Sequence, residues 1–264
     1  MKKTRKILTP KVYFIDMPLD MEIEMLNGFL FESFGGWNKY VLRRHPELKK
    51  AYTLKTDAER RAYIRNYIIQ FRKTHKAEMV KKKEQFQKAW KTVEKEYFTT
   101  LQELMDIEWP KQRNKIYAMI SINPICPRFL DEWNFSLFYN YDDIHRMIEV
   151  IMHESCHFLY FEKWKELYPK ADRKTFDAPY IEWYLSEISA PIILNEPRIQ
   201  PLLKKRARFY KEHQRIKIGT HTAPAYFKKI YTHCIKQEDG FALFLREAYK
   251  EIKKHKKLFL ESMK

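Results

Sequence analysis

The sequence has few glycines and few cysteines, and it contains no long apolar segment. Its 264 residues include 5 Gly, 3 Cys and 16% aromatic residues, a composition that excludes low-complexity and intrinsically disordered chains. Cys126, Cys156 and Cys234 are odd in number and too few for a disulfide framework, which favours a reducing compartment. No run of roughly 18 uncharged apolar residues occurs, so the sequence predicts no membrane-spanning helix.

The N-terminal segment starts with MKKTRK, which is basic like the start of a signal peptide. Pro10, Lys11 and Asp16 interrupt the following ILTPKVYFIDMPLD before an apolar stretch can form. We therefore expect a soluble protein in the cytoplasm.

The charge balance is strongly basic, with 51 Lys and Arg residues against 34 Asp and Glu residues and a net charge of +17. Such a charge raises encounter rates with nucleic acids, anionic membranes and acidic proteins. The lysine runs at 81–83 and 253–257 fall within helical patterns, where most of their charge faces solvent. No nucleic-acid module motif accompanies them, so the charge permits a nucleic-acid partner without predicting one.

The N-terminal half reads as helical. Neither Pro nor Gly occurs between Pro46 and Pro110, and apolar residues recur there every three or four positions. Thr56 followed by Glu59 has the form of a capping box, so we expect one or two long helices over 57–107. Residues 26–50 are also expected to be partly helical, with a break at the glycine pair 35–36.

The pattern changes between 113 and 139, where KIYAMISI and the alternating NFSLFY predict a small sheet of two or three strands. Helices are expected from Asp142 to about Leu167, through YIEWYLSEISA until Pro191 ends or kinks it, from Thr222, and over 241–260. The expected fold class is α+β and predominantly helical. One domain, 1–264, would comprise a helical lobe over 1–110 and a second lobe over 111–264, which contains the segment VIMHESCHFL.

The segment VIMHESCHFL contains the residues whose types and spacing indicate a metal site. Residues four apart lie on one face of a helix, so His153 and His157 can direct two imidazole nitrogens at one cation. Glu154 lies one step around the helix, where its carboxylate can reach a water held at an open metal position. The residues flanking the three are uncharged, as a buried metal helix requires. Zn²⁺ is the cofactor that this spacing predicts.

These residues resemble the gluzincins, zinc metallopeptidases with HExxH and a downstream glutamate ligand, and the resemblance covers roughly residues 113–195. The family often places its third ligand in Glu-x-x-Ala/Ser-Asp, and Glu187-Ile188-Ser189-Ala190 matches the first four positions. Pro191 stands where the family often has an aspartate that supports a zinc histidine. Glu182 is the alternative third ligand. The two glutamates are five positions apart, about 140° around a helix, so they cannot both face one metal.

The resemblance implies two further features. An edge strand before the metal helix, either NFSLFY or KIYAMISI, would pair with an extended peptide substrate. A Tyr or His downstream of the third ligand would stabilise the oxyanion, and Tyr231 and His233 are the named candidates among His221, Tyr226, Tyr231 and His233. Cys156 lies off the metal-facing side of its helix and is expected to be a small core residue.

The sequence therefore predicts a zinc metallopeptidase in which His153, His157 and Glu187 bind Zn²⁺, Glu154 is the general base and the substrate is a peptide or protein. A second hypothesis is a basic nucleic-acid-associated protein whose zinc site is structural or serves a DNA-linked protease. A third is a helical interaction protein in which the motif has arisen by chance. Zinc analysis of the pure protein separates the third hypothesis from the first.

Overall fold

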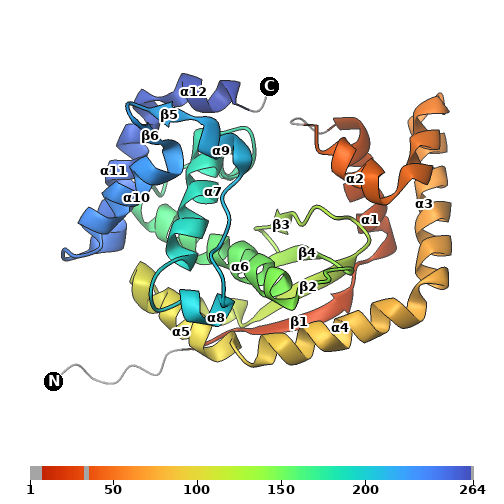
Figure 1. Cartoon of the computed structure of the whole chain (residues 1–264), viewed down its shortest axis with the longest axis horizontal. Helices are drawn as coiled ribbons and strands as arrows, with labels where there is room; N and C mark the ends of the chain where they lie inside the picture. Colours follow the sequence, from red (N-terminus) through yellow and green to blue (C-terminus); the bar gives the residue numbers. More distant parts are fainter. Residues whose placement is uncertain (1–7, 33–35, 263–264) are drawn as a thin grey trace. The chain divides into compact units, whose positions relative to one another are not determined.

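The chain is mainly helical, with one four-stranded sheet and one two-stranded sheet, in agreement with the expected α+β class (Figure 1). The structure is a computed structural model and describes residues 8–32 and 36–262. Contacts divide this part of the chain into unit 1, residues 8–10, 93–114 and 152–262, and unit 2, residues 11–32, 36–92 and 115–151. Each unit includes residues from both sides of position 110, where the sequence analysis places the boundary between two lobes.

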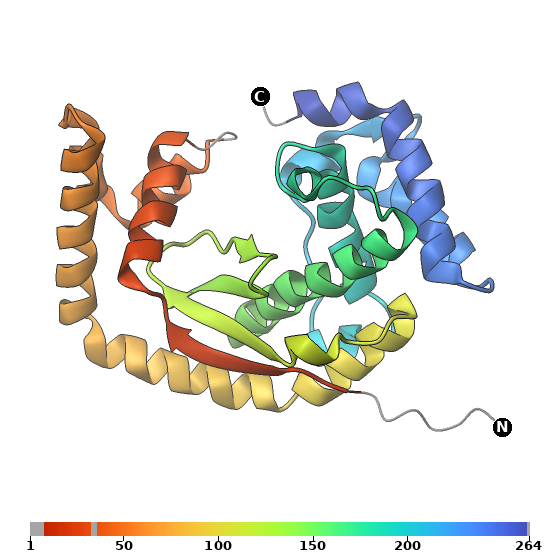
Figure 2. The same ribbon diagram turned by 180° about the vertical axis from the view of Figure 1, so that it is seen from behind.

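Unit 2 contains the larger sheet and the N-terminal helices. Its elements are β1 (Lys11–Asp16), α1 (Leu19–Asn27), the π-helical segment η1 (Gly28–Glu32), α2 (Asn38–Arg44), the 3₁₀ helix η2 (Pro46–Thr53), α3 (Asp57–Thr74), α4 (Lys76–Lys91), β2 (Lys115–Ser121), β3 (Arg128–Phe129) and β4 (Asn134–Phe138). The sheet order is β1-β2-β4-β3, in which β1 and β4 run parallel to β2 and β3 runs antiparallel to β4. In both views, α4 lies along β1 (Figures 1 and 2).

The order of the strands corrects the expectation about a substrate-binding edge. KIYAMISI forms β2, which pairs with β1 on one side and with β4 on the other, so it is not an edge. NFSLFY contains β4, whose outer side is also paired, because β3 lies against it and the Ser136 amide donates to the Pro127 carbonyl at 2.9 Å. The edges of this sheet are β1 and β3. Neither expected strand can therefore receive a peptide by strand addition.

A buried carboxylate connects three elements of unit 2. Glu22 on α1 is 0% exposed and accepts hydrogen bonds from the Ser121 hydroxyl at 2.5 Å and the Ile122 amide at 2.8 Å, at the end of β2. Arg72 on α3 forms an ion pair with it at 2.6 Å. Burial raises the pKa of Glu22 although Arg72 acts in the opposite direction. These polar contacts offset the cost of enclosing a carboxylate and fix α1 and α3 against the sheet.

Unit 1 surrounds one fully buried helix. Its elements are α5 (Glu94–Met105), η3 (Lys111–Arg113), η4 (Arg173–Phe176), α7 (Ile181–Leu194), α8 (Gln200–Leu203), α9 (Lys211–Arg215), β5 (Lys217–Ile218), β6 (His221–Thr222), α10 (Ala223–Cys234), α11 (Gly240–Lys254) and α12 (Lys256–Glu261). All 14 residues of α7 are buried, and α10, α11, α12 and η4 pack against it (Figure 2). The helix α6 (Ile144–Leu167) spans the division between the units, which falls after Ile151.

Local sequence signals account for most helix ends. The Thr56 hydroxyl accepts from the Glu59 amide and the Glu59 carboxylate accepts from the Thr56 amide, which confirms the capping box of α3. The region 57–107, where one or two long helices were expected, is divided into three, α3, α4 and α5. The described part of residues 26–50 is largely helical, as expected. The Thr222 hydroxyl caps α10 as expected, by accepting from the Ala225 amide at 3.3 Å.

Some expectations about helix ends were wrong by a small margin or fall outside the described residues. The side chain before α6 that accepts a hydrogen bond from the helix is Asp143, not Asp142, since its Oδ1 accepts from the His145 amide at 2.9 Å. Pro191 does not end α7, which continues to Leu194. MKKTRK and Gly35 lie outside the described residues, whereas Gly36 has a positive φ of 67°. Within the described ranges, no helix combines the length and apolar character needed to cross a bilayer.

Candidate metal centre

The two motif histidines face each other on α6. His153 and His157 are one helical turn apart, and their rings make an edge-to-face contact with centroids 4.8 Å apart. Their Nε2 atoms are 3.1 Å apart. His157 is 0% exposed and the His153 side chain is 16% exposed. The helical spacing thus places both nitrogens at one point, with one ring buried and the other reachable from solvent.

Glu187 on α7 completes the cluster. Its Oε2 lies 3.0 Å from His153 Nε2 and its Oε1 lies 3.4 Å from His157 Nε2. The carboxylate side chain is only 2% exposed. Among the described residues, these three form the single group whose potential donor atoms all lie within 4.8 Å of one another. The structure therefore brings together the three residues that the sequence analysis assigns to the metal.

The alternative ligand Glu182 is held elsewhere. It is buried on the same helix, and its Oε1 accepts a hydrogen bond from the Tyr249 hydroxyl of α11 at 2.7 Å. Glu182 and Glu187 point in different directions because five positions turn an α-helix by about 140° beyond one full turn. Glu187, and not Glu182, joins the two histidines.

The donor set is of a kind that could hold a tetrahedral zinc ion. With Zn–N and Zn–O distances of about 2.0–2.2 Å, neighbouring donors of a tetrahedral site are roughly 3.3–3.6 Å apart. Of the three observed separations, 3.4 Å falls in this range and 3.0 and 3.1 Å are shorter by a few tenths of an ångström, so a small outward movement of the side chains would admit the ion. If both Nε2 atoms carried a hydrogen, the two N–H groups would repel each other, because the nitrogens are 3.1 Å apart. If one Nε2 carried no hydrogen, its lone pair would face a carboxylate oxygen, which would also repel it. A cation between the three atoms resolves this conflict, and two imidazoles with one carboxylate are a known zinc ligand set.

Glu154 is the remaining residue of the motif and lies directly beside His153 in the chain. It is buried, with 8% of its surface exposed. A carboxylate in such surroundings interacts more strongly with nearby charge than one in water. This setting suits a group that must take and return a proton beside a metal.

Packing beneath the cluster fixes the helix that carries it. Tyr97 of α5 is 0% exposed, and its hydroxyl donates to the Met152 carbonyl at 2.5 Å, immediately before His153. On the other side of the motif, the His157 ring stacks on Phe161 at 6.2 Å. Cys156 is fully buried, as expected of a small core residue. These contacts fix the backbone before His153 and restrict the buried ring of His157.

Pro191 lies inside α7, one turn after Glu187. In a regular helix the amide of residue 191 would donate to the carbonyl of residue 187, and proline has no amide hydrogen to give. The helix still continues to Leu194 and every residue of it is buried. The position that the gluzincin pattern often fills with a supporting aspartate thus holds an apolar residue in the core.

The candidate oxyanion donors are not brought to the cluster by any contact among the described residues. Tyr231 is 1% exposed and its ring lies edge-on to Phe244, with centroids 5.2 Å apart. His233 is exposed on α10, and its Nε2 lies 3.0 Å from the side-chain nitrogen of Gln237. Their assignment as oxyanion donors therefore stays a prediction that rests on the family resemblance alone.

The other two residues considered for this role are also engaged away from the cluster. The Tyr226 hydroxyl donates to Glu251 at 2.7 Å, and His221 Nδ1 lies 3.1 Å from the Thr220 hydroxyl.

Sequence reasoning passed over His213, which is on α9 and only 1% exposed. Its ring lies against Trp183 and Tyr184 of α7, with centroid distances of 6.4 and 5.6 Å. Burial lowers the pKa of His213 to about 4, and Glu187 and His153 both act on it electrostatically. The surrounding segment KEHQR is polar and gives no sign that its histidine is buried.

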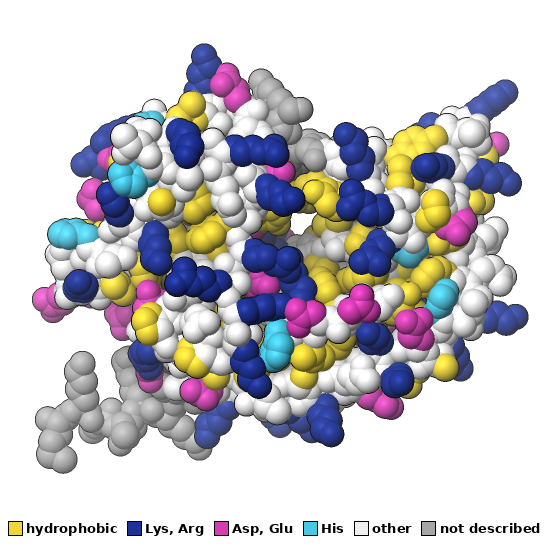
Figure 3. Space-filling model, in the orientation of Figure 1, with side chains coloured by type: hydrophobic (Ala, Val, Ile, Leu, Met, Phe, Trp, Pro, Cys, Tyr) yellow, Lys and Arg dark blue, Asp and Glu magenta, His cyan; other side chains and the backbone are white. Residues whose placement is uncertain are grey.

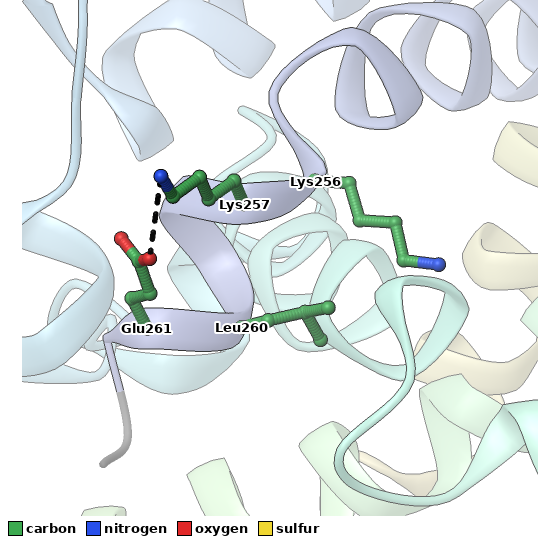
Figure 4. Close-up of a pocket in the computed structure, with 4 residues that line it drawn as sticks. All are labelled: Lys256, Lys257, Leu260 and Glu261. Carbon is green, nitrogen blue, oxygen red and sulfur yellow. Dashed lines mark ion pairs between the residues drawn. The ribbon is translucent and has the colours of Figure 1, made fainter.

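A surface hollow on α12 offers no comparable chemistry. It is lined by Lys256, Lys257, Leu260 and Glu261, which all come from one six-residue helix (Figure 4). Lys257 and Glu261 form an ion pair at 3.9 Å, so the one carboxylate there lies beside a cation. The hollow brings no titratable groups together from different elements.

A comparison with protein-family models, with curated proteins and with solved structures finds no match to this chain.

Proposed function

We propose that this chain is a zinc-dependent metallopeptidase of the gluzincin type that hydrolyses peptide bonds. The observation that carries the proposal is the convergence of His153, Glu187 and His157 from two buried helices, with donor atoms 3.0–3.4 Å apart. A helix that bears HExxH, a second helix that bears a glutamate, and an α+β fold with a small sheet are also the features of a zincin-like fold. Zn²⁺, when bound, would lower the pKa of a coordinated water to about 7 and withdraw electrons from a substrate carbonyl.

The residues of the chain have separate roles in this proposal. His153 and His157 present neutral imidazole nitrogens, and Glu187 presents a carboxylate oxygen that offsets the positive charge of the cation. Glu154 accepts the proton of the attacking water and then delivers it to the leaving amine, since one carboxylate can serve as base and then as acid. His157 and Glu187 are almost fully buried whereas the His153 side chain is 16% exposed, so a substrate would approach the site from the side of His153.

Glu154→Gln tests the assignment of the base. The amide keeps the shape of the side chain but cannot accept the proton, so zinc should remain stoichiometric while peptide hydrolysis falls by about 10²- to 10⁴-fold. Zinc is measured by metal analysis of the purified protein and hydrolysis on a mixed peptide library. Glu162→Gln is the matched control, because Glu162 lies on the same helix and makes only a surface ion pair with Lys165 at 2.9 Å. Undiminished hydrolysis by Glu154→Gln would remove Glu154 from this role.

The nucleic-acid hypothesis depends on the net charge of +17. Lys and Arg side chains occur on many parts of the visible face, and Asp and Glu side chains lie among them (Figure 3). A salt titration of duplex DNA binding decides the matter, because phosphate contacts give a steep fall of affinity with salt and a flat response discards the hypothesis.

A further inference from the structure

His213 is a buried imidazole without a hydrogen-bond partner among the described residues. It is 1% exposed, and neither Nδ1 nor Nε2 makes a hydrogen bond to any part of the chain that the structure describes. Burial of a polar group without a partner costs free energy, and native proteins satisfy nearly all such groups. A ligand or a buried water would supply the partner that the described residues do not give this ring.

The position of His213 indicates where that partner binds. Its ring contacts Trp183 and Tyr184, which precede Glu187 by four and three residues on α7. Residues three and four apart share a helix face, so His213 lies against the face of α7 that presents Glu187. Glu187 and His153 also act on His213 electrostatically, in opposite directions, and such effects weaken with distance. The ring contacts with Trp183 and Tyr184 thus place His213 on the side of α7 that carries Glu187, and the electrostatic effects agree with this position.

His213 is nevertheless not one of those ligands. Within the described residues, the group of donors that lie within 4.8 Å of one another contains only His153, His157 and Glu187. Burial keeps the imidazole neutral near pH 7, so one ring nitrogen carries a hydrogen and the other a lone pair. Several other buried polar atoms of the described residues lack a hydrogen-bond partner, including the hydroxyls of Tyr184 and Tyr231. The groups that act electrostatically on Tyr231 are Glu196 and Cys156, not Glu187 or His153.

We propose that His213 is part of this site and donates a hydrogen bond from its ring to the carbonyl oxygen of a peptide bound at the metal ligands. This inference rests on the proposed peptidase function. The carbonyl oxygen gains negative charge when water attacks the amide, so a fixed neutral donor stabilises the transition state more than the bound substrate. An oxygen-bearing ligand also supplies the partner that the buried ring lacks in the chain.

The activity test compares two substitutions of one residue. His213→Phe keeps a planar ring against Trp183 and Tyr184 but has no donor, so kcat should fall by about 10²- to 10³-fold with KM changed by less than roughly threefold. His213→Gln keeps an N–H donor and should recover part of kcat. Zinc content should equal that of wild type in both. His255→Phe is the matched control, because His255 lies between α11 and α12 and its ring contacts Tyr226.

A binding test does not require the substrate to be known. Inorganic phosphate serves as a tetrahedral oxyanion and is titrated into Co²⁺-loaded protein, with the visible spectrum of the metal as readout. His213→Phe should bind phosphate at least about tenfold more weakly than wild type, since one hydrogen bond to a charged acceptor is lost. The phosphate affinity of His213→Gln should lie between those of the wild type and His213→Phe. If His213→Phe does not fold, the comparison of His213→Gln with the wild type still tests the proposal.

The outcomes separate this inference from the proposed function. Equal phosphate affinity in wild type and both variants would assign His213 to packing or to a buried water, whether or not any peptide is cleaved. If the wild-type protein binds zinc and cleaves no peptide, the peptidase proposal fails. If its phosphate affinity nevertheless depends on His213, His213 still belongs to the site, but its role toward a peptide carbonyl is overturned. Unchanged kcat in His213→Phe with an active wild type would overturn the inference.

Discussion

At the scale of single residues, Glu182 and Glu187 provide a matched pair on one buried helix. Glu187→Gln removes the negative oxygen from the cluster of donors, whereas Glu182→Gln alters only the acceptor of the Tyr249 hydroxyl. Loss of a residue that hydrogen-bonds to a metal ligand lowers metal affinity roughly 10- to 100-fold, and loss of the ligand itself should lower it further. We expect Glu187→Gln to lose zinc and Glu182→Gln to retain it in a competition titration with a chelator. Equal zinc affinity in the two variants would contradict the assignment.

His45 of unit 2 makes a second prediction, about pH. It is buried, its Nδ1 lies 2.8 Å from the Tyr67 hydroxyl and its Nε2 lies 2.8 Å from the Ile122 carbonyl. Since a carbonyl can only accept, Nε2 carries the hydrogen, and Nδ1 accepts from the tyrosine. Burial lowers the pKa of His45 below its ordinary value of 6.5 and so favours the neutral ring, although the hydrogen bond to the Ile122 carbonyl acts in the opposite direction.

The direction of the pH effect follows from this depressed pKa. The unfolded chain binds the proton of His45 more readily than the folded chain, so the stabilising contribution is complete above about pH 6.5 and is lost as the pH falls below it. His45→Gln should therefore be less stable than wild type at pH 7 but lose less stability between pH 7 and pH 5. Urea unfolding at several pH values measures both effects. An identical pH slope in the two proteins would mean that His45 does not contribute.

The meeting of His153 and His157 was predictable because helical spacing acts over short distances, whereas Glu187 was expected from the resemblance to the gluzincin pattern. His153 and His157 are four residues apart, and Ala190 marked the helix face of Glu187. The sequence could not predict His213, whose burial depends on contacts with Trp183 and Tyr184 about thirty residues away. It also could not choose against Glu182 from its surroundings, because Tyr249 is 67 residues distant.

At the scale of elements, the capping box of α3 can be tested directly. Thr56→Ala leaves the Glu59 amide without its acceptor, and a cap of this kind is worth about 1 kcal/mol. We expect the free energy of unfolding to fall by about that amount, as measured by urea denaturation. Thr92→Ala is the control, because the Thr92 hydroxyl donates to the Ala89 carbonyl at 2.7 Å at the end of α4 and caps no amide. Equal losses in both variants would show that the box adds nothing.

Helices that have a capping residue and a regular apolar pattern were predicted well. A strand whose pairing partner lies far away in the sequence was not. α3, α7 and α10 were expected from caps and apolar periodicity, and the structure confirms them. β1 was missed, although KVYFID is rich in β-branched and aromatic residues, because its partner β2 begins about one hundred residues later and no local pattern reports that pairing. The same distance explains the wrong expectation that β2 was an edge.

At the scale of the whole molecule, removal of zinc should lower stability. A ligand that binds only the folded protein stabilises it by about 2.7 kcal/mol when its free concentration is 100 times its Kd. A chelator should therefore lower the thermal midpoint of the wild type, and added zinc should restore it. Glu187→Gln provides the reference, since it should show little response to either treatment. A wild-type midpoint that ignores both chelator and zinc would count against a metal bound by the folded chain.

The two units alternate along the chain, which passes between them after Pro10, Thr92, Asn114 and Ile151. Neither unit can therefore be obtained by deleting one end of the protein, because a cut near residue 110 separates residues 93–110 from the rest of unit 1 and strand β1 from β2. To produce one unit alone, the segments of that unit would have to be joined by new linkers at several positions. Limited proteolysis that nicks one surface loop should accordingly leave fragments that stay associated until denaturant is added.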